Sequence, residues 1–358
     1  MPIDYRTLNQ GFVVEGRFVA LPLSMWDECL PLAPDASYIT ALAESPETGL
    51  IYGATCGTEC HLFVTGTRGS AGGTLDLGTV PDAQRIPSLA VTGTRDGRDQ
   101  LLAAVNRPTG CALVCAEVSF SRDVIQEPSF YQPSVEAMSE HDGHRWFTVS
   151  AGREGAVRLL RDDGLFRYVN ASGQLEEQEK LPEDARPASP ILSCGDASGL
   201  RWLDDAGRAH GVGIDATEPR RTACGSPPAR DCTAICGFRN GALIAEANGT
   251  VHHADFSAGE VTEAGRTVLP DIQCMAALPD GRLYGMCGTG IGHFFRIDLG
   301  SRESHDLGAV ASVIATKRYG LEFGCALTGI QGDIFFGEND RGGHLWLYMP
   351  AQRSDSLI

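Results

Sequence analysis

The stretch GRLYGMCGTGIGHFFRI at residues 281–297 contains a glycine, a short apolar segment, a glycine-rich turn and a histidine that begins a second apolar segment. The same order recurs in GLIYGATCGTECHLFV at 49–64 and in GDIFFGENDRGGHLWLY at 332–348, with the histidine twelve residues after the first glycine each time. Short apolar runs that are rich in β-branched and aromatic residues and bounded by glycine are typical of strands. Each stretch therefore predicts two antiparallel strands joined by a tight turn.

Diverged copies of this pattern fill the rest of the chain, and a short strand rich in small residues precedes each copy. We expect seven such units, which start near residues 38, 85, 132, 186, 231, 271 and 321. Their mean spacing of about 47 residues is in the range of propeller blades. The sequence therefore predicts an all-β fold, a seven-bladed β-propeller that forms a single domain over residues 1–358.

The last unit offers only three strands, at 321–328, 333–337 and 344–349, and lacks an outermost one. The segment GFVVEGRFVAL at 11–21 precedes the first unit and has the apolar character of a strand. A circular array of sheets must protect its exposed strand edges. We therefore expect residues 11–21 to pair with the last unit and close the ring, which makes the first and last units neighbours.

The composition limits the classes of partner. With 29 basic and 46 acidic side chains, the formal charge of −17 disfavours a nucleic acid. No apolar run approaches a membrane span, and no phosphate loop or dinucleotide fingerprint is found, so we expect no membrane and no nucleotide cofactor. Twelve cysteines without a CxxC pair indicate reduced thiols, which favours a cytoplasmic protein unless a secretory signal has been removed. The oligomeric state stays open.

Three histidines recur in register, and ring closure is expected to bring their units side by side. His61, His293 and His344 would then share one sector of the face that we expect to carry the site. Imidazole moves protons near neutral pH and binds metals, so the three could act as base and acid or hold one divalent cation, Ca, Mn or Zn. Alternatively, a histidine that recurs in register is structural and hydrogen-bonds to the backbone of the adjacent blade. His141 and His144 are expected in a connection at the opposite face.

Arginines and tyrosines gather near the predicted starts of the first strands, where they could ring the channel mouth. They are Tyr38, Arg85, Tyr131, Arg186, Arg230, Arg318 and Tyr319. A basic mouth in an acidic body would attract an anionic small ligand, and Arg341 in the last turn could grip a carboxylate. The acids Glu338 and Asp340 of the same turn could be ligands of a hard cation. The alternative is that these side chains are solvated residues at strand ends.

The repeats LYG…GTGIGHFFRIDL…HDLG, IYG…HLFV and FFGENDRGGHLWLY resemble those of seven-bladed propeller polysaccharide lyases, such as rhamnose–glucuronate lyase. The resemblance implies β-elimination next to a uronic acid, in which Arg or a metal neutralises the carboxylate and His or Tyr removes the C5 proton. The catalytic candidates that it implies are His61, His293, His344, Tyr131 and Tyr319. The substrate-binding candidates are Arg85, Arg186, Arg318, Arg341 and Tyr38.

Two other functions stay open beside a lyase that acts on an anionic carbohydrate or other small molecule. A non-catalytic platform would bind a protein or peptide on the same face, and would present exposed apolar patches there. A metal-dependent hydrolase or isomerase would act on a small metabolite within the channel. One scaffold hosts many chemistries, so the fold does not decide among the three.

Overall fold

A computed structural model describes most of the 358-residue chain. The described residues are 17–23, 32–66, 74–95, 98–119, 134–152, 155–169, 174–188, 193–196, 198–214, 221–225, 231–290, 292–310, 312–314, 317–340 and 343–350. Within these ranges the secondary structure is almost entirely β, with two three-residue 3₁₀ turns, η1 (Pro34–Ala36) and η3 (Glu183–Ala185). No helix in the described part of the chain is long and apolar enough to cross a bilayer.

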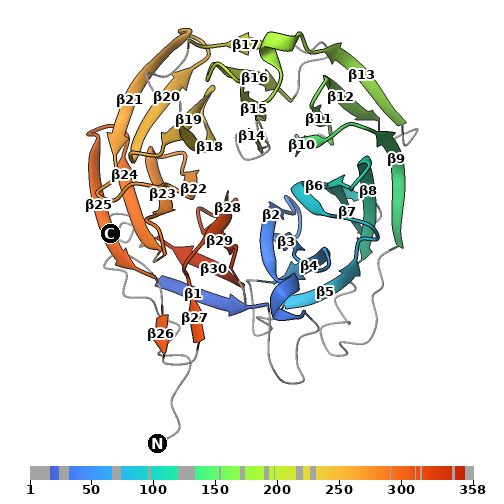
Figure 1. Cartoon of the computed structure of the whole chain (residues 1–358), viewed down its shortest axis with the longest axis horizontal. Coiled ribbons are helices and arrows are strands. Elements are labelled where there is room, and N and C mark those ends of the chain that lie inside the picture. Colours follow the sequence, from blue (N-terminus) through green and yellow to red (C-terminus); the bar gives the residue numbers. More distant parts are fainter. Residues whose placement is uncertain are drawn as a thin grey trace, which may run out of the picture.

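The strands form seven four-stranded antiparallel sheets arranged in a ring, as Figure 1 shows. Blades one and two contain β2 (Tyr38–Glu44), β3 (Ile51–Cys56), β4 (His61–Thr65), β5 (Thr74–Thr79), β6 (Arg85–Arg95), β7 (Arg98–Asn106), β8 (Gly110–Ser119) and β9 (Ser134–Asp142). Blades three and four contain β10 (Trp146–Ala151), β11 (Val157–Arg161), β12 (Gly164–Val169), β13 (Gln174–Lys180), β14 (Ser193–Asp196), β15 (Gly199–Leu203), β16 (Ala209–Gly213) and β17 (Thr222–Ala223).

The remaining blades follow the same order, from the channel outward. Blades five and six contain β18 (Cys232–Phe238), β19 (Gly241–Glu246), β20 (Thr250–Asp255), β21 (Glu260–Arg266), β22 (Cys274–Ala277), β23 (Arg282–Cys287), β24 (His293–Asp298) and β25 (Glu303–Ala309). Blade seven contains β28 (Phe323–Thr328), β29 (Ile334–Glu338), β30 (His344–Met349) and β1 (Arg17–Pro22). A separate hairpin of β26 (Ser312–Ile314) and β27 (Lys317–Tyr319) lies between blades six and seven in the sequence.

The amino-terminal strand β1 closes the ring, as the sequence predicts. It pairs antiparallel with β30, and Phe18 lies opposite Tyr348. The Phe18 side chain is 1% exposed, and its ring centroid lies 5.1 Å from that of Phe294 and 5.0 Å from that of Trp346. Burial of a phenylalanine of this kind stabilises a fold by about 2–3 kcal/mol. Residues 11–16 of the predicted closing segment lie outside the described residues.

The motif that recurs in the sequence has a packing explanation. Gly53 lies opposite Phe63 on the next strand, and a Cβ atom built at Gly53 would lie 2.0 Å from Cζ of that ring. Gly285 and Phe295 repeat the arrangement in blade six, with 2.6 Å between the same atoms. The glycine after the buried tyrosine therefore gives space to an aromatic ring of the neighbouring strand. This requirement fixes the Tyr-Gly…His-x-Phe spacing without any reference to function.

The structure corrects two of the predicted unit boundaries. Residues 134–142 form β9, the outermost strand of blade two, and the innermost strand of blade three is β10. The expected start near 132 is wrong because the strands of blade two are long, nine to eleven residues each, so this blade uses more chain than the mean spacing allows. The innermost strand of blade four begins at Ser193 and not near 186, because η3 occupies the chain just before residue 186.

Candidate functional site

The candidate histidines and the starts of the innermost strands lie at the same end of the blades. The innermost strand starts where the second strand ends, as the pairs Tyr38 with Cys56, Arg85 with Asn106 and Phe323 with Glu338 show. The turn between the second and third strands lies at the same end. We call this end the top face. Binding residues on such turns are held in place by the rigid blades beneath them.

The three recurrent histidines each bind a carboxylate of their own blade. His61 Nδ1 lies 3.2 Å from Asp76, His293 Nδ1 lies 3.3 Å from Asp306, and His344 Nδ1 lies 2.5 Å from Glu338. Within the described ranges the groups of side chains with metal-ligand spacing do not include these three imidazoles together. The structure thus places them at the top faces of blades one, six and seven but does not bring them into one cluster.

The same carboxylate pairing extends beyond these three. His210 Nε2 lies 2.9 Å from Asp204 in blade four, and His252 Nε2 lies 2.7 Å from Glu246 in blade five. A histidine–carboxylate pair is therefore a repeated feature, which spans the second-to-third turn in blades four, five and seven and joins the third and fourth strands in blades one and six. The partner is a side chain of the same blade, which differs from the expected bond to the backbone of the adjacent blade.

The pKa values of His61 and His210 shift in opposite directions. Burial opposes the charged imidazole of His61, but hydrogen bonds and charges from Asp76 and Glu59 outweigh it and raise the pKa of His61. Both nitrogens of His61 face carboxylates, because Nε2 lies 3.4 Å from Glu59. Burial lowers the pKa of His210 in spite of Asp204. The raised pKa favours the protonated form of His61 between its two acids, which suits a structural role better than proton abstraction.

The turn of blade seven differs from the others because it carries two acids. Glu338 is fully buried, and its carboxylate accepts hydrogen bonds from the Gly320 N–H and from His344 Nδ1. Asp340 accepts a hydrogen bond from the Leu321 N–H at 3.2 Å. Burial and the charge of Glu338 raise the pKa of Asp340 to about 8. The top face of blade seven therefore holds an imidazole and a carboxylic acid that share one carboxylate.

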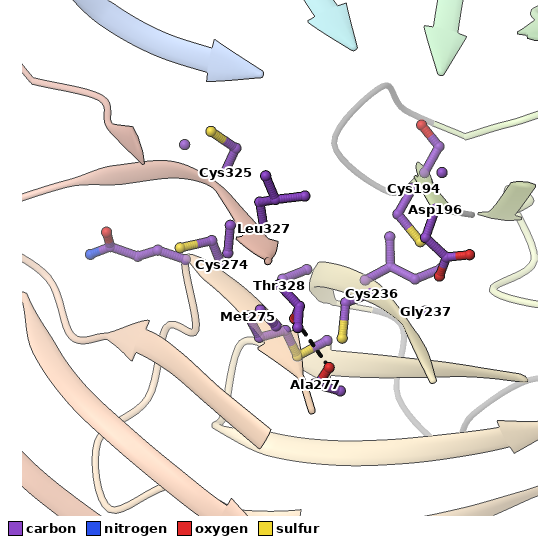
Figure 2. Close-up of a pocket in the computed structure, with 18 of the residues that line it drawn as sticks. Cys194, Asp196, Cys236, Gly237, Cys274, Met275, Ala277, Cys325, Leu327 and Thr328 are labelled. Atoms are coloured by element: carbon purple, nitrogen blue, oxygen red, sulfur yellow. Dashed lines mark hydrogen bonds between the residues drawn. The ribbon is translucent and has the colours of Figure 1, made fainter. Parts of the chain in front are cut away.

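A cavity of about 240 Å³ occupies the centre of the ring beneath this face. Figure 2 shows side chains from several innermost strands around it, with the Thr328 hydroxyl donating a hydrogen bond to the Ala277 carbonyl at 3.1 Å. Among the described residues that line it, Arg85 is the one basic side chain and Asp196 the one acidic side chain. Asp196 is neutralised by Arg201, whose Nη1 lies 2.9 Å away. The uncompensated charge of the cavity is therefore the cation of Arg85.

Four thiols also line the cavity, one from each innermost strand of blades four to seven. They are Cys194, Cys236, Cys274 and Cys325, and all are free thiols. Burial raises the pKa of Cys194 and of Cys325 to about 12, and it raises those of the other two well above the ordinary value. These cysteines are therefore neutral at physiological pH and make this wall of the channel weakly polar.

The predicted ring of arginines and tyrosines is only partly found. Arg85 and Tyr38 begin innermost strands, as expected. Arg186 is exposed and follows η3, several residues before β14. Arg318 and Tyr319 lie on β27, because the hairpin is inserted before the innermost strand of blade seven. Two members of the predicted ring, Tyr131 and Arg230, lie outside the described residues, and so does Arg341 of the last turn.

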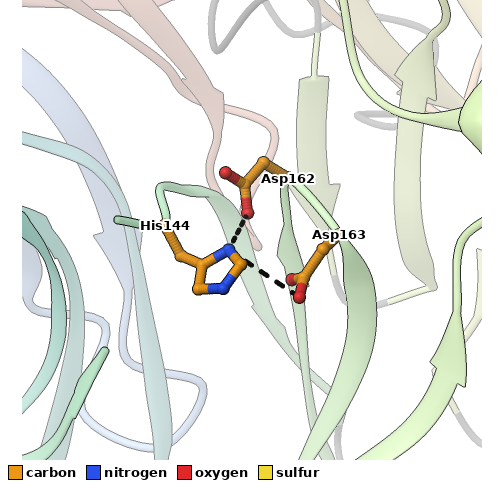
Figure 3. A group of neighbouring side chains, drawn as sticks. All are labelled: His144, Asp162 and Asp163. Carbon is orange, nitrogen blue, oxygen red and sulfur yellow. Dashed lines mark hydrogen bonds and ion pairs between the residues drawn. The ribbon is translucent and has the colours of Figure 1, made fainter. Parts of the chain in front are cut away.

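Sequence reasoning missed one cluster, whose three side chains Figure 3 shows; it lies at the top face of blade three, where β10 begins and β11 ends. His144 Nδ1 lies 3.0 Å from Asp162 and 3.7 Å from Asp163, and one ligand atom from each residue lies within 4.8 Å of the others. Arg161 also binds Asp163, with Nε 2.6 Å from Oδ1, and lowers the pKa of Asp163 although burial opposes this. The group has the donor types of a divalent-cation site. It was expected at the opposite face because the boundary of unit three was misplaced, although the Asp162–Asp163 pair in a turn could have indicated it.

A second group with metal-ligand spacing lies at the other end of blade six. It consists of Asp298, Glu303 and His305, and the Arg296 Nη2 lies 3.0 Å from Asp298. An arginine thus binds an acid in both groups. No protein-family model matches this chain, and no curated protein matches it either.

Proposed function

We propose that this protein binds a uronate-containing oligosaccharide at the top-face mouth of the channel and cleaves it by β-elimination. The observation that carries the proposal is Arg85. Its guanidinium lines the central cavity of a chain with a formal charge of −17, and no carboxylate among the described residues lies within ion-pair distance of it. Its electrostatic neighbours are the thiols of Cys56 and Cys325. An unpaired guanidinium beside neutral groups is suited to bind a ligand carboxylate.

In the proposed reaction Arg85 neutralises the carboxylate of the uronate, which acidifies the C5 proton. A base then removes that proton, the C4–O4 bond breaks and a C4–C5 double bond forms. We assign the base to His344, because Nδ1 donates its hydrogen bond to the Glu338 side chain, so that the neutral ring carries its lone pair on Nε2. The leaving oxygen must take up a proton as the bond breaks. Both the arginine and the histidine belong to the top face.

The test is incubation with a panel of uronate oligosaccharides, read by the ultraviolet absorbance of the unsaturated product. We expect product with the wild type and a loss of about 100-fold or more with Arg85→Ala, since the C5 proton is harder to remove when the adjacent carboxylate keeps its full negative charge. The matched control is Arg186→Ala, which removes an exposed arginine that does not line the cavity. A wild type that gives no product with any member of the panel contradicts the proposal.

A second candidate function is a metal-dependent hydrolase or isomerase of a small metabolite, and the observation that favours it is the group of His144, Asp162 and Asp163. A divalent cation held there would polarise a substrate oxygen or activate water. This function predicts that chelation abolishes activity and that His144→Ala does the same. The lyase proposal predicts that neither treatment changes the rate of elimination.

A protein-docking platform has less support. The described residues include three large apolar side chains that are exposed, namely Leu75, Val268 and Ile330. They belong to three different segments, at β5, after β21 and after β28. A platform would need a contiguous apolar patch.

A further inference from the structure

A second cavity lies between blades five and six, which are neighbours in the ring (Figure 1). Its volume is about 230 Å³. It is lined by the turn between β18 and β19, by β20 and β21, and by the turns between β22 and β23 and between β24 and β25. These turns lie at the end of the blades opposite the top face, which we call the bottom face. No described residue lines both this cavity and the central one, so the two are separate.

Two arginines line this cavity, one from each blade. Arg239 belongs to the turn after β18, and Arg302 belongs to the turn before β25. Neither guanidinium lies within ion-pair distance of a carboxylate in the part of the chain that the structure describes. The guanidinium of Arg239 lies over the ring of Phe238, with Cζ 4.9 Å from the ring centroid. Two guanidiniums without acidic partners, in a chain with a formal charge of −17, are suited to bind an anion.

The backbone at both positions favours a different residue. The φ angle is 50° at Arg239 and 62° at Arg302, which is the left-handed region where glycine is the unstrained choice. A strained residue of this kind points to a function of its side chain. The geometry of the turns therefore does not account for an arginine at either position.

The acidic side chains of the cavity offset the two arginines only in part. Asp280 is bound by Arg282, whose Nη2 lies 2.6 Å from Oδ2. Glu263 on β21 is exposed and has no ion-pair partner among the described residues. Glu263 is thus the one acid of the described wall whose charge opposes a bound anion.

One polar atom of the cavity wall lacks a partner. The ring of His253 packs edge-on against Phe238, with centroids 5.6 Å apart, and its Nε2 is buried without a hydrogen-bond partner in the described ranges. Burial lowers the pKa of His253, and the charge of Arg239 adds to this effect against the opposing charge of Asp255. The ring is therefore neutral near pH 7 and can pair with a ligand oxygen, which would remove the cost of a buried polar atom without a partner.

We propose that this bottom-face cavity binds the phosphate group of a small molecule, with Arg239 and Arg302 as its cationic ligands and His253 as a neutral hydrogen-bond partner. A phosphate group carries about −1.5 to −2 charges near neutral pH, which two guanidiniums offset. Its oxygens also match the paired N–H groups of a guanidinium. The site is independent of the proposed function, because it lies at the opposite face and shares no residue with that function.

The test is calorimetric titration of inorganic phosphate into the full-length protein at low ionic strength. We expect binding that remains in Arg85→Ala, because Arg85 lines the central cavity and not this one. Arg239→Gly and Arg302→Gly should each weaken it at least about tenfold, since each removes charge-assisted hydrogen bonds. Both variants should fold, because glycine suits the two backbone conformations. The matched control Arg186→Ala removes an exposed arginine outside the cavity and should bind like the wild type.

Two further arms test the charge and the chemical class. Glu263→Gln should tighten phosphate binding about threefold, since it removes a nearby negative charge. Acetate should bind at least about tenfold more weakly than phosphate, because it carries a single charge. A wild type that binds no phosphate overturns the proposal, as does binding that Arg85→Ala abolishes or that survives unchanged in both glycine variants. Equal binding of acetate and phosphate overturns the assignment of the ligand as a phosphate.

Discussion

Ring closure by β1 makes a quantitative prediction for the substitution Phe18→Ala. The Phe18 side chain is 1% exposed and packs against Phe294, Phe336, Trp346 and Tyr348, with ring centroids 5.0 to 6.3 Å apart. Its removal loses the burial of a whole aromatic side chain and leaves a cavity between blades six and seven. Losses of this kind cost about 3–5 kcal/mol of unfolding free energy. A typical domain has a total stability of only about 5–15 kcal/mol, so the change is large.

The assay is chemical denaturation at equilibrium, followed by tryptophan fluorescence and by circular dichroism. Leu75→Ala is the matched control, because Leu75 also lies on an outermost strand, β5, but is 39% exposed. The control should change the unfolding free energy by no more than about 0.5 kcal/mol. If Phe18→Ala also costs less than about 1 kcal/mol, then β1 does not close the ring in solution.

Three further predictions concern other parts of the molecule. Gly53→Ala should destabilise the fold by about 1–3 kcal/mol or more, because the new Cβ atom would meet the buried ring of Phe63. Gly300→Ala is the control and should be nearly neutral in the same denaturation assay, because a Cβ atom there has open space around it. Burial and the charge of Glu338 raise the pKa of Asp340 to about 8 in the folded state, whereas the unfolded chain loses this proton near the ordinary pKa of an aspartate. The free energy of unfolding should therefore fall as the pH rises between those two values. Asp340→Asn should flatten that part of the stability–pH curve, and an unchanged slope would contradict this. His144→Ala should abolish binding of Zn or Mn measured by calorimetry, and binding that survives the substitution would exclude the blade-three cluster.

The fold could be predicted because its main constraints are local. Gly53 and Phe63 must occur at a fixed spacing for the second and third strands to pack, so the repeat is visible in the sequence. The missing outermost strand of the last unit required a partner, and β1 supplies it. The boundary near 132 failed because small residues alone do not distinguish β9, at the outer edge, from an innermost strand.

The site was harder to predict because its properties depend on distances between segments. The pattern at Glu338 to His344 shows charged side chains in a turn, but the protonation of Asp340 depends on its burial and its contact with Glu338. The short hairpin β26–β27 displaced Arg318 from the expected start of an innermost strand, and no feature of its residues indicated that insertion. The role of each histidine depends on its acidic partner, which lies six residues away in some blades and thirteen or fifteen in others.

The central claim is that the top-face mouth selects a carboxylated ligand through Arg85. Isothermal titration with a short uronate oligosaccharide and with its neutral methyl ester tests it most directly. We expect the wild type to bind the acid form and not the ester, and Arg85→Ala to bind neither. Equal binding of the two ligands by the wild type, or full binding of the acid form by Arg85→Ala, would contradict it.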